Sequence, residues 1–103
     1  MTIRWITFRI ADRTVNGETY DDRYQALVEA IESNSTVQWN EPTYFYLVRH
    51  GLRPIIEKMK AAINPQLDMF ATGVVGGTNV SAYGAFDAAS LQEVVGQNVI
   101  LLR

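Results

Sequence analysis

Cysteine is absent from this sequence, and histidine occurs once, at His50. Without cysteine the chain forms neither a disulfide framework nor a thiolate metal site, and thiol catalysis is excluded as well. A single histidine excludes a metal site built from several histidines of one chain. The only lysines are Lys58 and Lys60, so the sequence lacks the basic run that drives tight, non-specific binding to nucleic acid.

Long apolar runs are missing too. The apolar stretch near the N-terminus is interrupted by Arg4 and Arg9, so it lacks the unbroken apolar segment of a secretory signal. No run approaches the roughly 20 residues that a helix needs to span a bilayer. We therefore expect a soluble, cytoplasmic protein with no membrane partner.

The remaining composition is that of an ordinary globular domain. The 103 residues are 48% hydrophobic and 19% charged, with a formal net charge of -2. A chain of this length buries roughly 65% of its unfolded surface, which is enough for one hydrophobic core. We predict a single domain over 1–103, with its core at about 2–77 and a C-terminal extension at about 78–103.

Hydrophobic periodicity predicts strands that alternate with helices. In the first strand, Ile6, Phe8 and Ile10 share one face, which we expect to meet the helices. Apolar residues at i, i+3, i+4 and i+7 mark one stripe on each of two helices. We expect strands at 2–11, 36–39, 43–49 and 67–75, helices at about 19–33 and 53–63, and a tail with an extended segment at 79–85, a short helix at 87–95 and a strand at 97–102.

The order strand, helix, strand, strand, helix, strand predicts an α+β fold. Both strand–helix–strand connections have the length of a right-handed crossover, and two crossovers around a hairpin give the ferredoxin-like βαββαβ arrangement. We expect the helices on one face of an antiparallel sheet, with an additional C-terminal strand. The other face is too apolar to remain in water, so we predict a homodimer through it. Its predicted interface residues are Trp5, Thr7, Arg9, Phe45 and Leu47.

Five stretches of the sequence are similar to one known family. They are ITFRI, DDRYQALVEAIES, PTYFYLVR, LRPIIEKMKAAI and LDMFATGVVGG, and they span roughly residues 3–77. Their spacing and apolar positions resemble the SinR family of small bacterial proteins, related in fold to the small CRISPR-associated spacer-acquisition subunit and, more distantly, to the VapD ribonucleases. The resemblance implies a ferredoxin-like homodimer, some of whose relatives are metal-dependent nucleases.

The metal-binding aspartate of those relatives lies near the end of the first strand, where this sequence has Arg9. A cation at that position repels Mg²⁺ instead of binding it. We therefore expect a non-catalytic interaction module with no cofactor and no metal site, whose partner is a second copy or another protein. The alternative is a Mg²⁺-dependent (ribo)nuclease or toxin-like protein with Asp12 as its catalytic residue, aided by a carboxylate such as Glu41 or Asp68.

Arginines near the strand ends are candidates for contacts with nucleic acid or another anion. A local patch forms only if they converge, and the net charge of -2 disfavours nucleic acid as a partner. These candidates are Arg9, Arg13, Arg49 and Arg53, and Arg4 would join them in such a patch.

Three further features have a structural and a functional interpretation. His50 precedes a predicted helix and is expected to be a loop histidine rather than a general base. The glycine-rich stretch 73–84 has neither the G-x-G-x-x-G nor the Walker pattern, so we expect a hairpin or hinge rather than a phosphate-binding loop. A third hypothesis for function places a small-molecule pocket near Tyr20, Tyr24 and Tyr83.

Overall fold

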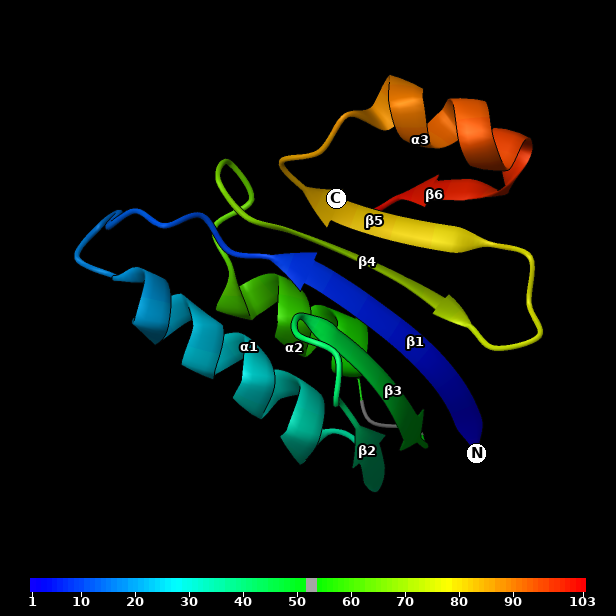
Figure 1. The fold of residues 1–103 in the computed structure, drawn as a ribbon, viewed down its shortest axis with the longest axis horizontal. Helices are drawn as coiled ribbons and strands as arrows, with labels where there is room; N and C mark the ends of the chain where they lie inside the picture. Colours follow the sequence, from blue (N-terminus) through cyan, green and yellow to red (C-terminus); the bar gives the residue numbers. More distant parts are fainter. Residues whose placement is uncertain (52–53) are drawn as a thin grey trace.

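The computed structural model describes residues 1–51 and 54–103 (Figure 1). Each predicted strand and helix is present, with boundaries that differ by a few residues. The elements are β1 (Thr2–Arg9), α1 (Tyr20–Ser33), β2 (Val37–Trp39), β3 (Phe45–His50), α2 (Ile55–Ala62), β4 (Met69–Val74), β5 (Val80–Gly84), α3 (Ala88–Val95), a 3₁₀ turn (Gly96–Asn98) and β6 (Val99–Leu101). Within the described ranges, no helix combines the length and the apolar character needed to cross a bilayer.

The strands form one sheet in the order β2-β3-β1-β4-β5-β6. Neighbouring strands are antiparallel except β5 and β6, which are parallel. The α+β class is therefore confirmed, but the prediction of an antiparallel sheet is wrong at the last strand. The strands β5 and β6 are parallel because α3 connects them, and a helical crossover returns the chain in the direction of the preceding strand.

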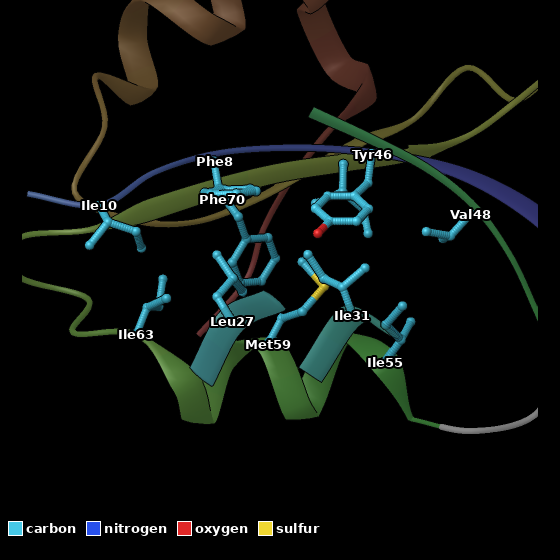
Figure 2. Close-up of a cluster of buried hydrophobic side chains, with 11 residues drawn as sticks. Phe8, Ile10, Leu27, Ile31, Tyr46, Val48, Ile55, Met59, Ile63 and Phe70 are labelled. Atoms are coloured by element: carbon cyan, nitrogen blue, oxygen red, sulfur yellow. The ribbon is translucent and has the colours of Figure 1, made fainter. Parts of the chain in front are cut away.

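The prediction that the helices cover one face of the sheet holds only for α1 and α2. Figure 2 shows α3 on the opposite side of the sheet from that pair. The crossover through α1 leads from β1 toward the β2 edge, whereas the crossover through α3 leads toward the β6 edge. Two right-handed crossovers that start from strands of the same direction and lead to opposite edges place their helices on opposite faces.

The hydrophobic core lies between the sheet and the pair α1 and α2 (Figure 2). The predicted alternation in β1 is confirmed, because Ile6, Phe8 and Ile10 are all buried. The core residues are Ile6, Phe8, Ile10, Leu27, Ile31, Tyr46, Val48, Ile55, Met59, Ile63 and Phe70.

The start of α1 follows the capping signal in the sequence. Thr19 Oγ1 accepts from Asp22 N at 3.1 Å, and Asp22 Oδ2 accepts from Thr19 N at 2.9 Å. This reciprocal capping box satisfies two backbone donors that the first turn of a helix leaves free. It fixes the point at which the long β1–α1 loop ends.

The strand β3 begins at Phe45, later than the predicted Thr43. Tyr44 has φ +62°, a left-handed conformation that an extended strand cannot include. Its carbonyl accepts from Phe8 N at 3.2 Å, and its hydroxyl lies 2.9 Å from the Tyr20 hydroxyl. Contacts on both sides therefore hold this turn residue in place.

The prediction of a loop histidine is wrong, because His50 is the last residue of β3. It lies opposite Thr2 of β1, so the ladder extends one residue further than the sequence suggests. Its side chain is only 6% exposed, and Nε2 accepts from Arg4 Nε at 3.1 Å. His50 is therefore part of the packed end of the sheet.

Candidate functional site

The sheet face opposite α1 and α2 carries a line of large apolar side chains across three strands. Trp39 of β2 lies opposite Leu47 of β3, and Leu47 lies opposite Trp5 of β1. Directly opposite residues in an antiparallel ladder point to the same face. We define the open-face patch as Ile3, Trp5, Val37, Trp39, Phe45 and Leu47.

Half of this patch is widely exposed to solvent. Val37 is 55% exposed, Ile3 46% and Trp39 44%, whereas the other three patch residues are partly covered by their neighbours. The Trp5 indole lies so close over Gly73 that a Cβ there would come within 2.7 Å of it. A shallow hollow of about 170 Å³ lies between the β1, β2 and β3 side chains of the patch.

The patch contains its own aromatic packing. The rings of Trp39 and Phe45 meet edge to face with centroids 6.4 Å apart. Trp39 Nε1 donates to Glu41 Oε2 at 2.7 Å, which fixes the indole from its other side. These two contacts fix the orientation of the Trp39 ring within the patch.

The structure brings the five predicted interface residues to this one face. Thr7 lies opposite Phe45, Trp5 opposite Leu47, and Arg9 further along the same face of β1. Two of them also have partners in their own chain. Thr7 Oγ1 donates to Tyr44 O at 3.2 Å, and Arg9 Nη2 donates to Ala85 O at 2.6 Å.

Sequence reasoning missed three members of the patch, Ile3, Val37 and Trp39. Ile3 could have been predicted from the sequence, because it shares one face of β1 with Trp5. The face on which the two β2 residues lie could not be predicted, because a three-residue strand does not show its alternation without its register on β3.

The predicted arginine contacts do not gather at one place. Arg49 lies opposite Ile3, and Ile3 is six residues before Arg9 on β1. Arg49 and Arg9 are therefore roughly 20 Å apart along the strand direction. Arg13 lies exposed in the loop after β1, near the Arg9 end. The fourth candidate, Arg53, lies outside the described residues.

Asp12 is exposed in the β1–α1 loop. The buried Asp68 accepts from Arg23 Nε at 2.8 Å and from the backbone N–H groups of Ala11 and Asn64, both at 2.9 Å, so both its oxygens are engaged. Among residues 1–51 and 54–103, no group of three or more histidine, cysteine, aspartate or glutamate side chains is placed to hold a metal ion. A catalytic role for Asp12 stays a prediction.

The structure does not bring the three predicted tyrosines into one pocket. Tyr20 and Tyr24 stack with ring centroids 5.8 Å apart, while Tyr83 packs against Phe70 on β4. Phe8 packs against Tyr24 and lies opposite Phe70 in the β1–β4 ladder, so these two core residues stand between the two groups. The hydrogen bond with the Tyr44 hydroxyl is the main cause that raises the pKa of Tyr20 from 10.0 to about 12.

The open-face patch is thus the feature in which the predicted residues come together. Its chemistry is apolar and aromatic, with Arg49 between Ile3 and Val37 as the charged residue inside it, and it suits contact with another surface better than proton transfer. Comparisons of this chain with protein-family models, with curated proteins and with solved structures find no match.

Proposed function

We propose that this chain is a ferredoxin-like interaction module that forms a homodimer through the open-face patch. The observation that carries the proposal is the line Trp39–Leu47–Trp5 across three neighbouring strands on a face open to water. Single exposed apolar residues are normal, but a contiguous group marks a contact site.

The strand order supports the ferredoxin-like part of the proposal. The segment β2-β3-β1-β4 is antiparallel throughout, with α1 and α2 as the crossovers that cover its other face. The strand β5, the helix α3 and the strand β6 then extend the sheet beyond β4. Membership of the SinR family, whose dimers the sequence resembles, remains a prediction.

A second copy is the occupant that suits this patch best. A symmetric dimer needs a surface that complements itself, and an apolar surface does so without matching charges. Arg9 lies beyond the apolar centre of the patch, where a dimer leaves a solvated rim. Arg49 lies within the patch, between Ile3 and Val37 and beside the line Trp39–Leu47–Trp5. Both tryptophans of the chain belong to the patch, and tryptophan is among the residue types that contribute most to binding energy at interfaces.

Sedimentation equilibrium tests the dimer with a matched pair of variants. Val37→Lys places a charge in the patch at a side chain that is 55% exposed, and Val94→Lys places the same charge on α3 at one that is 86% exposed. We expect twice the chain mass of 11.6 kDa for the wild type and for Val94→Lys, and 11.6 kDa for Val37→Lys. A wild-type mass of 11.6 kDa at every concentration would overturn the proposal.

A further inference from the structure

Arg4 lies on the helix side of the sheet and is held by two uncharged acceptors. Its Nε donates to His50 Nε2 at 3.1 Å, and its Nη1 donates to Thr72 Oγ1 at 3.2 Å. Because Nε2 accepts, the His50 ring carries its proton on Nδ1, which lies 3.2 Å from Gly51 O. Thr72 in turn donates its hydroxyl proton to Trp5 O at 2.8 Å. The guanidinium is therefore fixed in orientation from two sides.

This cation has no counter-charge in the part of the chain that the structure describes. The ion pairs there are Arg23 with Asp68 and Lys60 with Glu57, and neither includes Arg4. Burial lowers the pKa of Arg4, since a charge withdrawn from water loses solvation free energy. Partly buried charges are normally compensated, so Arg4 is placed to gain from an anion.

One nitrogen of Arg4 remains available to a ligand. Its Nη2 has no acceptor among the described residues. No buried side-chain nitrogen or oxygen in those residues lacks a partner. It follows that Nη2 is not fully buried and that its two N–H donors lack a partner among the described residues.

A pocket lies beside Arg4, where β4 and β5 separate. Pairing between these strands ends at Thr72 opposite Ser81, although β4 continues along β1 to Val74. The connection between β4 and β5 leaves the sheet there and encloses a pocket of about 260 Å³. The residues that matter for its chemistry are Arg4, Thr78, Asn79 and Ser81 on the polar side and Ile56 and Ile100 on the apolar side.

We propose that this pocket binds the phosphate group of a small phosphomonoester. Arg4 Nη2 supplies the charge, and the hydroxyls of Thr78 and Ser81 supply further donors. Among the described residues, Arg4 is the only charged one in the lining, and no hydrogen bond there engages the side chains of Thr78, Asn79 or Ser81. A guanidinium matches the oxygens of a phosphate with parallel N–H donors, and its fixed orientation reduces the entropy lost on binding.

The size and the apolar wall of the pocket define the ligand further. Drug-sized ligands occupy pockets of roughly 300–1,000 Å³, so about 260 Å³ suits a compact molecule. The side chains of Ile56 and Ile100 give the ester carbons an apolar surface. The glycine-rich stretch lacks the lysine of a phosphate-binding loop, and in this fold Arg4 brings a cation to it from the other end of the sequence.

A ¹H–¹⁵N NMR titration of the full chain tests the site. The probes are propyl phosphate and inorganic phosphate, each added at constant ionic strength. We expect saturable shifts of the backbone amides of residues 76–81, with tighter binding of propyl phosphate. Arg4→Gln should weaken binding by about tenfold or more, because a hydrogen bond to a charged group is lost.

Arg13→Gln is the matched control, since it removes one positive charge from an exposed site at the far end of β1. It should bind propyl phosphate as the wild type does. Shifts that do not saturate, or equal affinities of Arg4→Gln and the wild type, would overturn the proposal. Equal affinity for the two probes would assign the site to free phosphate and would overturn the proposal that its ligand is a phosphomonoester.

A second variant keeps the test decisive if Arg4→Gln does not fold. Ser81→Ala removes one donor from the pocket and leaves the Arg4 contacts to His50 and Thr72 in place. Its affinity for propyl phosphate should fall by about threefold or more, as expected for one neutral hydrogen bond. An unchanged affinity of Ser81→Ala would count against the site.

Discussion

Arg23 and Asp68 form a fully buried ion pair, in which Arg23 Nε lies 2.8 Å from Asp68 Oδ2. The other guanidinium nitrogens donate to the carbonyls of Glu18 and Ala11, both at 2.8 Å. The pair therefore ties the β1–α1 loop to the first turn of α1 and to the residue that precedes β4.

This ion pair gives the first prediction. Arg23→Met leaves the buried Asp68 carboxylate without its cation, and removing one partner of a buried pair typically costs about 3–5 kcal/mol. We expect the free energy of unfolding in urea to fall by that amount. Arg13→Met is the control, because an exposed substitution changes stability by only about 0.5 kcal/mol. A similar effect of the two variants would show that the pair does not stabilise the fold.

The close approach of Gly84 to Asp68 gives the second prediction. Gly84 has φ +104°, and a Cβ there would lie 2.1 Å from Asp68 O, which accepts from Ala85 N at 2.8 Å. We expect Gly84→Ala to lower the free energy of unfolding by about 3 kcal/mol or more, because strain and steric overlap act together.

Gly17→Ala separates the two causes. Gly17 also has a positive φ, +81°, but nothing lies within 4 Å of its added Cβ. Its cost should be the backbone strain alone, about 1–2 kcal/mol. Equal losses for Gly84→Ala and Gly17→Ala in chemical denaturation would disprove the steric contact with Asp68.

The capping box of α1 gives a prediction about pH. Hydrogen bonds from Thr19 hold the pKa of the Asp22 carboxyl below its ordinary value of 3.8. A group whose folded pKa is depressed contributes stability above its unfolded pKa, and this contribution is lost as pH falls through the folded pKa. The wild type should therefore exceed Asp22→Asn in stability at neutral pH, and the difference should shrink below pH 3.8. Urea unfolding of both proteins across that range measures it, and a difference that does not vary with pH would refute it.

The sequence predicts the elements of this fold better than its buried charges. The apolar stripe of α1 was found from Leu27 and Ile31, and Arg23 lies on the same stripe at the same four-residue spacing. Its burial could not be inferred, because its partner Asp68 is 45 residues away and only the folded chain brings them together. The side of the sheet that α3 covers likewise depends on the direction in which its crossover runs.

The candidate site likewise has one part that the sequence predicts and another part that it does not. Alternation along β1 and β3 placed Trp5, Thr7, Arg9, Phe45 and Leu47 on one face, which the registers confirm. The patch residues of β2 depend on its register on β3, and the pocket beside Arg4 depends on where β4 and β5 separate. Both are properties of strand pairing, which local patterns do not specify.

Tryptophan fluorescence tests the open-face dimer most directly, because both tryptophans, Trp5 and Trp39, belong to the patch. Quenching by acrylamide is measured over a protein concentration series for the wild type, Val37→Lys and Val94→Lys. The dimer predicts that quenching weakens as concentration rises for the wild type and for Val94→Lys, and stays constant for Val37→Lys. Wild-type quenching that is independent of concentration, with a mass of 11.6 kDa throughout, would contradict it.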